Sequence, residues 1–421
     1  MKRNEAFMSG RLNRREMLKR SAAVAAAVPA FAAAGSLVGP RAVSAQGLSG
    51  SLTFWHGLTA EAAVLNDTIL PEWAKANPNV KINVLQVPFD QLQNKYNTEA
   101  SAGGGPDVLL GPSDWVGQYV DSDVVKSLKD VMDDATKATF NDASLALFTL
   151  KDTLYAVPQN INGIGFVFNK KLMATAPATT DDLIAEAAKI ASANAGSHGF
   201  GIFPQFYNNA AYLNGFGGAA LTADDKSGFD QQPAIDWLTY LQKLTKSPGV
   251  FVGADQNAVE SLFKEGKLAA MQNGPWFTQG GTEGVGAENF GVAVLPAISS
   301  RSNAPAKPYV GGTGLYINAN ASDSQTKLAY EFAKWFATKG TEALVAKAGQ
   351  FPASKDVALP ADNPNVKAWT DQYANGVALP NSPKMSAVWT PADDMVNKVM
   401  IGGADPATAA KDAAATINKA G

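Results

Sequence analysis

The chain of 421 residues contains no cysteine and only two histidines, His56 and His198. The lack of cysteine excludes a disulfide, a thiolate metal site and a cysteine nucleophile. Two histidines are too few for a histidine-rich metal site. Arginine is also scarce, because Arg301 is the only one after residue 45. We therefore expect neither a metal centre nor a cofactor.

The first 45 residues differ in composition from the rest. They contain eight Lys or Arg against two Glu, and seven of the eight precede an alanine-rich apolar run over residues 22–38. A basic head, an apolar middle and small residues at the exit are typical of an export signal, and Arg14 followed by Arg15 resembles the twin-arginine type. We predict cleavage between Ala45 and Gln46. An N-terminal membrane anchor is the alternative, but the apolar run is short and weak for a span.

Removal of this segment leaves an acidic protein. The whole chain has 35 Lys and Arg and 38 Asp and Glu. Loss of the eight positive and two negative side chains of the first 45 residues leaves 27 positive and 36 negative side chains, a net charge of −9. This balance argues against nucleic acid and anionic membranes as partners. No cysteine follows the cleavage site to carry a lipid anchor. We predict a soluble monomer in the periplasm.

Strand-like and helical patterns alternate along the remaining chain, which predicts an α/β layered fold. Thr179 or Thr180 is a suitable N-cap for one of the helices, and Pro71 is expected to kink or restart another. The predicted strands are 52–55, 80–84, 107–110, 163–168, 291–295 and 314–318. One helix is predicted to begin near residue 60, and the others are predicted at 90–100, 180–193, 232–245, 259–263, 325–336 and 407–419.

Three loops follow predicted strands and are rich in aromatic and amide side chains: 55–57, 111–115 and 158–162. In open α/β sheets, ligands bind outside the carboxyl ends of the strands. We therefore expect these loops to contribute to a binding site.

Aromatic residues beside amides or carboxylates suit a sugar, because sugar ring C–H faces lie well on aromatic rings and buried hydroxyls need hydrogen-bond partners. Each candidate also has a structural alternative. The four tryptophans on helical patterns are predicted to pack in the core, Asp114 could cap a helix, and His56 could be a structural group. The candidates are Trp115 beside Asp114, Tyr207, Trp276 and Trp389, and the core tryptophans are Trp73, Trp237, Trp335 and Trp369.

Two other functions are weighed against sugar binding. A secreted glycoside hydrolase needs two facing carboxylates, and although Asp114 and Glu61 can be imagined as a pair, no motif supports them, so we predict no catalytic residues. A receptor for a phosphorylated polyol needs arginines or a helix N-terminus, and a ferric receptor needs more tyrosine and carboxylate in these loops. The single Arg301 disfavours the anion.

Two long segments carry a family resemblance. Residues 263–276 combine a helix, a glycine stop, a strand and then Asn-Gly-Pro-Trp, and residues 379–389 end in Trp389 before a helix. Shorter matches lie at 105–108, 155–158, 168–170 and 307–311. With these segments in this order, the chain resembles the extracellular solute-binding proteins of ABC importers, of the maltose-binding type, from residue 52 to 417.

The resemblance implies a type II periplasmic-binding-protein fold, with two α/β lobes that each contain a mixed sheet flanked by helices. Three segments would cross between the lobes, near 155–158, 308–311 and 354–359. One lobe would hold residues 46–157 and 311–358, and the other 158–310 and 359–421. A sugar would lie between the lobes, and ABC permease subunits in the membrane would be the protein partner.

The resemblance also implies site residues. Trp276, Trp389 and Tyr207 fall where the family places aromatic sugar platforms in the second lobe, and Asp114 falls where it places a hydroxyl-binding carboxylate in the first.

The first lobe departs from the family pattern. Gly111 stands where the maltose receptor has a stacking tryptophan, and amides or uncharged residues replace its charged residues at Gln93, Asn94, Thr59, Ala60 and Asn162. We expect the replacement contacts to come from His56, Trp115, Gln93 and Asn162, and the ligand need not be maltose.

Overall fold

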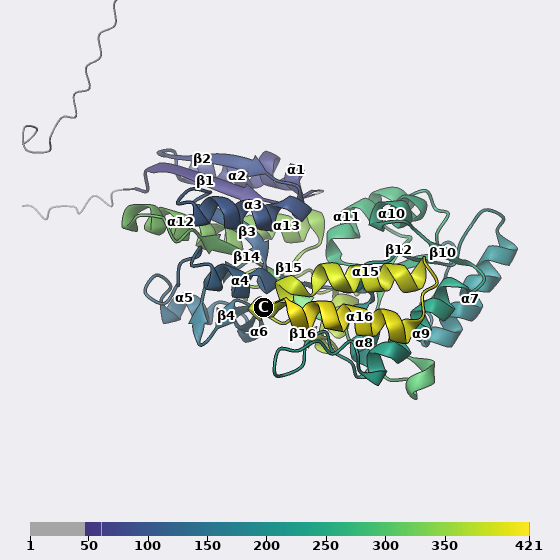
Figure 1. Ribbon diagram of the computed structural model, residues 1–421. Coiled ribbons are helices and arrows are strands. Elements are labelled where there is room, and N and C mark those ends of the chain that lie inside the picture. The colour runs from purple at the N-terminus through teal and green to yellow at the C-terminus, as the bar shows by residue number, and fades with distance from the viewer. Residues whose placement is uncertain (1–46, 60, 421) are drawn as a thin grey trace, which may run out of the picture. The chain divides into compact units, whose positions relative to one another are not determined.

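The computed structural model describes residues 47–59 and 61–420. The predicted export signal, its cleavage site and Ala60 lie outside these residues. Two five-stranded sheets flanked by helices make up the described chain, and a smaller four-stranded sheet connects them (Figure 1).

The first sheet has the strand order β2-β1-β3-β14-β6. Strand β1 pairs in parallel with β2 and β3, whereas β14 runs antiparallel to β3 and β6. The strands are β1 (Gly50–His56), β2 (Val80–Gln86), β3 (Val108–Pro112), β6 (Ala156–Pro158) and β14 (Thr313–Ile317).

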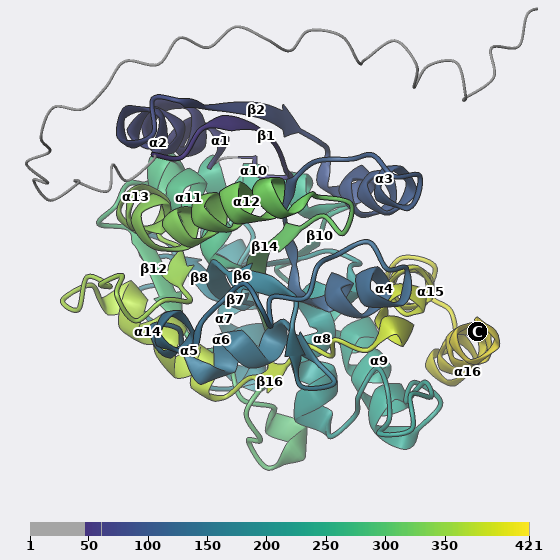
Figure 2. The ribbon, with the colours of Figure 1, turned by 90° about the vertical axis from the view of Figure 1, so that its left-hand side faces the viewer.

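Helix α12 lies against β1 and β14 of this sheet, as Figure 2 shows. The hairpin β4 (Thr149–Leu150) and β5 (Thr153–Leu154) lies outside the sheet. The helices of this half are α1 (Ala62–Val64), α2 (Leu70–Ala76), α3 (Phe89–Ser101), the 3-10 turn η3 (Ser113–Trp115), α4 (Val116–Asp121), α5 (Asp134–Ala138), α6 (Asp142–Leu147), α12 (Asp323–Trp335) and α13 (Thr341–Ala348).

The helix expected to kink or restart at Pro71 contains a five-residue π turn, η2 (Leu65–Ile69), between α1 and α2. Pro71 lies in the first turn of α2. Proline has no N–H, and its ring collides with the carbonyl four residues earlier in a regular helix. The wider π turn lets the chain continue past Pro71, and it brings Trp73 into the core.

The second sheet has the order β10-β9-β11-β8-β12, in which β8 runs antiparallel to β11 and β12. Its strands are β8 (Gly165–Asn169), β9 (Phe200–Ile202), β10 (Val250–Val252), β11 (Ala270–Asn273) and β12 (Phe290–Ala293). Its helices are α7 (Thr180–Ala193), α8 (Phe206–Phe216), α9 (Gln232–Thr245), α10 (Gln256–Lys264), the 3-10 turn η4 (Pro275–Phe277), α11 (Thr278–Val285), α14 (Pro364–Ala374), the 3-10 turn η7 (Pro383–Ala387), α15 (Trp389–Met400) and α16 (Pro406–Lys419).

Local signals explain several of these helices. Thr179 caps α7 in a reciprocal capping box with Asp182, as its position before the apolar period predicts. Helices α15 and α16 lie side by side (Figure 1), and both contact α9. Of the four tryptophans predicted for the core, three are buried, namely Trp73, Trp237 and Trp369, and Trp335 is half-buried against it.

The third sheet, in the order β15-β7-β13-β16, forms the hinge. Each of the three chain segments that pass between the two large sheets contributes one strand: β7 (Asn160–Gly163), β13 (Tyr309–Gly311) and β15 (Phe351–Pro352). Strand β7 pairs antiparallel with both others. The fourth strand, β16 (Val377–Ala378), pairs with β13.

Buried amides tie the hinge segments together. The Gln350 Oε1 atom accepts hydrogen bonds from Gln159 Nε2 at 3.1 Å and from Asn160 Nδ2 at 3.2 Å. The Gln350 Nε2 atom donates to the buried carboxylate of Glu61 at 3.2 Å. All four side chains are buried, so each of these hydrogen bonds substitutes for a hydrogen bond to water that is lost on folding. Removal of one partner therefore leaves a buried polar group without a hydrogen bond.

The variant Gln350→Ala is expected to lower the free energy of unfolding by about 2–4 kcal/mol, because the buried Asn160 amide and Glu61 carboxylate lose their bond to it and the Gln159 Nε2 atom keeps only its bond to Thr341. Urea denaturation measures this change. Gln325→Ala is the control, because Gln325 makes a comparable bond to the Ser51 carbonyl at the surface and should cost less than about 1 kcal/mol. Equal losses in the two variants would contradict a tightly coupled hinge network.

Candidate functional site

The three aromatic residues predicted as platforms come together in the second half of the molecule. The ring centroid of Tyr207 lies 6.5 Å from that of Trp276 and 6.3 Å from that of Trp389. All three side chains are partly buried, with one side packed on the core. They come from α8, η4 and the first residue of α15, so segments far apart in sequence present their rings to one region.

The Asn-Gly-Pro-Trp turn after β11 explains the position of Trp276. The Asn273 side chain accepts a hydrogen bond from Gly274 N at 2.8 Å and donates to Glu260 at 2.9 Å, which holds the turn. The indole of Trp276 folds back over Gly274, where any side chain would collide with it. Glycine is therefore required for this ring position.

Asp393 fixes Tyr207 relative to Trp389. Its Oδ1 atom accepts a hydrogen bond at 2.7 Å from the backbone N–H of Phe206, the first residue of α8. Asp393 belongs to α15, which begins at Trp389. The bond thus ties the helix that carries Tyr207 to the helix that carries Trp389, and no local sequence pattern reveals it, because 187 residues separate the partners.

Asp114 from the first half meets this aromatic group directly. The indole Nε1–H of Trp389 donates to Asp114 Oδ2 at 3.1 Å, across 275 residues of sequence. The Asp114 side chain is only 7% exposed. Burial raises its pKa to about 6, and its own backbone N–H and the Trp389 indole lower it in part.

The alternative role of Asp114 as a helix cap is not observed. The N-cap positions of η3 and α4 are Pro112 and Trp115, and neither has a side-chain capping bond. The carboxylate is instead directed to Trp389.

Trp115 occupies the space left by Gly111. A Cβ atom at Gly111 would lie 2.9 Å from the indole of Trp115, so no larger residue fits there while the ring stays in place. Trp115 itself is buried, and its ring lies 5.6 Å from Phe89 and 6.0 Å from Tyr119. Phe89 is 56% exposed and was not predicted as a site residue.

The other three predicted residues have partners within the protein. His56 is buried and accepts from Leu58 N through Nδ1 at 3.2 Å, and burial lowers its pKa to about 4. Gln93 is half-buried and donates to Gln118 at 2.8 Å. Asn162 lies on the hinge strand β7 and donates to Asn160 at 3.3 Å. Their contact with a ligand stays a prediction.

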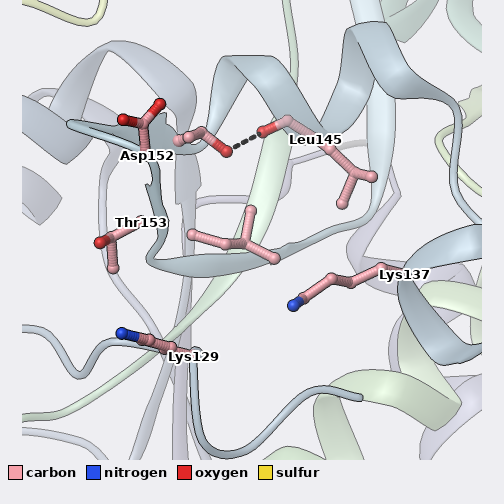
Figure 3. Close-up of a pocket in the computed structure, with 7 residues that line it drawn as sticks. Lys129, Lys137, Leu145, Asp152 and Thr153 are labelled. Atoms are coloured by element: carbon pink, nitrogen blue, oxygen red, sulfur yellow. Dashed lines mark hydrogen bonds between the residues drawn. The ribbon is translucent and has the colours of Figure 1, made fainter. Parts of the chain in front are cut away.

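A separate cavity of about 200 Å³ lies beside the β4–β5 hairpin (Figure 3). It is lined by Lys129, Lys137, Leu145, Thr149, Asp152, Thr153 and Leu154. None of the predicted site residues lines it. Within residues 47–59 and 61–420, no group of three or more His, Asp or Glu is placed to hold a metal ion. No helix in the same part of the chain is long and apolar enough to span a membrane.

The family model of the bacterial extracellular solute-binding proteins matches residues 56–343, more than half of the chain. A galactooligosaccharide-binding protein of Bacillus subtilis is 29% identical over 363 residues, which cover 80% of this chain and 82% of that protein. A maltooligosaccharide ABC transporter solute-binding lipoprotein of Streptococcus pneumoniae is 28% identical over 344 residues, with coverage of 77% and 79%.

Solved structures show the same fold. The GacH receptor of Streptomyces glaucescens, studied unliganded and in complex with acarbose and an acarbose homolog, matches with a TM-score of 0.81 and 25% identity, covering 89% of this chain and 99% of that one. The two-lobe α/β fold predicted from the sequence is confirmed, and so is the family resemblance.

The raised pKa of Asp114 predicts a pH-dependent stability. The pKa of this carboxyl is 3.8 in an unfolded chain and about 6 in the fold. Between about pH 4 and pH 6 the folded state therefore holds a proton that the unfolded state has released, and stability falls as the pH rises through this window. At pH 7 the penalty is about 3 kcal/mol.

The variant Asp114→Asn removes that penalty and should be more stable than the wild type at pH 7, with the advantage lost near pH 4. Urea denaturation of the unliganded proteins at pH 4, 5, 6 and 7 measures the difference. Asp121→Asn, at an exposed carboxylate of α4, is the control. Parallel profiles for wild type and Asp114→Asn would contradict the buried-carboxylate account.

Proposed function

The chain belongs to the bacterial extracellular solute-binding protein family, and we propose that it is the sugar-binding component of an ABC transporter. It would capture a sugar between its lobes and deliver it to the membrane permease. The maltooligosaccharide relative, itself part of an ABC transporter, and the galactooligosaccharide-binding relative support this proposal.

The observation that carries the proposal is the meeting of three aromatic rings from one lobe with one carboxylate from the other. Trp276, Tyr207 and Trp389 offer apolar faces of the kind that sugar C–H surfaces cover. Asp114 offers two acceptor oxygens in a low-dielectric setting, where bonds to hydroxyl donors are strong. The combination matches the two surfaces of a sugar ring.

The charges favour a neutral ligand over an anion. Arg301 is the single arginine after residue 45, and its guanidinium donates to the Phe216 carbonyl at 3.1 Å and lies over the Phe216 ring. It is therefore engaged at α8 and not offered to a phosphate. A carboxylate at the centre of the site would also repel an anion.

A hydrolase is not supported either. Glu61, the possible second carboxylate, is buried in the hinge network and bonded to Gln350. The relatives named above are binding proteins. We propose a receptor without catalytic residues.

We further propose that the two lobes comprise residues 46–157 with 311–358 and residues 158–310 with 359–421, and that they close around the sugar about the hinge sheet. A closed form with more ligand contacts is favoured by binding. The proposal includes export by a twin-arginine signal cleaved after Ala45, and a soluble periplasmic monomer. His56, Trp115, Gln93 and Asn162 are proposed as further contacts of the first lobe.

Trp276→Ala should weaken oligosaccharide binding about 10- to 100-fold, because a large stacking surface is lost from a site that keeps its polar groups. Isothermal titration measures the affinity for a sugar that the wild type binds. Trp335→Ala is the matched control, since Trp335 is a half-buried tryptophan that packs on Trp73 in the other lobe. An unchanged affinity of the Trp276→Ala variant for the sugar would contradict the proposal that Trp276 is a sugar platform.

A neutral ligand should raise the melting temperature of the wild type by several degrees at about 100 times its dissociation constant, because it binds only the folded state. A thermal-shift screen against mono-, di- and oligosaccharides, repeated at 0.05 and 0.5 M salt, measures this effect. The shift should be nearly independent of salt. A shift produced by phosphorylated polyols and abolished at high salt would favour an anion receptor instead.

A further inference from the structure

Phe89 is an exposed aromatic side chain beside the site. It is 56% exposed, whereas the neighbouring Trp115 ring, 5.6 Å away and tilted by 35°, is buried. One side of Phe89 thus covers Trp115 and the rest faces solvent. A single exposed apolar side chain is common on protein surfaces, so the contact with Trp115, the residue next to Asp114, is what makes Phe89 a candidate ligand contact.

The location of Phe89 at the strand ends is set by α3. Phe89 is the first residue of that helix, and a Cβ atom at Gly57, just after β1, would lie 3.3 Å from its ring. Gln93 is one helical turn further on the same face, and it is bonded to Gln118 of α4. This face of α3 is therefore turned toward α4 and the segment that carries Asp114 and Trp115.

Two aromatic groups, Phe89 with Trp115 in the first lobe and Trp389 with Tyr207 and Trp276 in the second, are linked through Asp114. Phe89 contacts Trp115, whose neighbour Asp114 accepts the bond from Trp389. Trp389 in turn lies 6.3 Å from Tyr207, which lies 6.5 Å from Trp276. The second-lobe end is partly buried, and the Phe89 end is open.

We propose that Phe89 is the platform of an outer subsite, which stacks on a sugar ring beyond those held by the second-lobe cluster. The ligand is accordingly an oligosaccharide that reaches from Trp276 to the first lobe. This inference rests on the proposed function and deepens it. Phe89 supplies the apolar surface in the first lobe where Gly111 offers none and Trp115 is buried.

Phe89→Ala tests the subsite through chain-length dependence. Two series of probes are titrated by calorimetry: α-1,4-linked gluco-oligosaccharides and β-1,4-linked galacto-oligosaccharides of one to five rings. In the wild type, affinity should rise with length. Phe89→Ala should lower the affinity for the longest bound member about three- to tenfold and leave the shortest bound member within about twofold.

Two controls accompany this variant. Phe89→Tyr keeps the ring and should retain the wild-type length dependence. Leu85→Ala removes another exposed apolar side chain of the same lobe, on β2, and should leave binding of every probe unchanged. Urea denaturation checks that each variant is folded.

The outcomes separate the subsite from the function. If the wild type binds these sugars but Phe89→Ala keeps the full length dependence, the subsite is overturned and the receptor function stands. Unchanged binding together with reduced transport by the reconstituted permease would reassign Phe89 to permease docking. If the wild type binds no member of either series, the proposed function in its oligosaccharide form fails, and the subsite with it.

Discussion

The hydrogen bond from the Trp389 indole to Asp114 is the contact on which the proposed site depends, because it joins a carboxylate of one lobe to an aromatic residue proposed as a sugar platform in the other. A buried carboxylate is stable only when donors replace its lost hydration. Its pKa of about 6 shows that one indole and a backbone N–H replace that hydration incompletely. Sugar hydroxyls are further donors for the same oxygens, so ligand binding would complete what the protein alone satisfies only in part.

The hinge imposes the second constraint. Three strands from distant segments share one small sheet, and Gln350, next to β15, is bonded through buried amides to Gln159 and Asn160 at the start of β7 and to Glu61. Each half has its own buried core, so in the proposed closure the two lobes would move as rigid bodies about this hinge network. The α4 segment also contacts the second lobe, since a side chain at Gly117 would collide with the backbone at Asn381 and Pro383. The position of Asp114 opposite Trp389 follows from both contacts.

Local signals in the sequence were sufficient for much of the fold. The apolar periods predicted α9 at its observed bounds, and Thr179 predicted the start of α7, because both depend on neighbours in the chain. The three aromatic residues predicted as platforms do lie together, and their contact with a ligand stays a prediction. The Asp114–Trp389 bond joins residues 275 apart, which no local pattern reveals. Phe89 was missed because at the start of an amphipathic helix its pattern does not distinguish burial from exposure. The burial of His56 and Trp115 likewise depends on packing that composition does not encode.

The most direct measurement of the central claim is a crystal structure of the protein with an oligosaccharide that it binds in solution. We expect sugar rings stacked on Trp276 and Trp389, with Tyr207 alongside, and at least one hydroxyl within hydrogen-bond distance of Asp114. A sugar bound elsewhere, for example in the cavity beside the β4–β5 hairpin, with these aromatic rings uncovered and the Trp389–Asp114 bond unaltered, would contradict it.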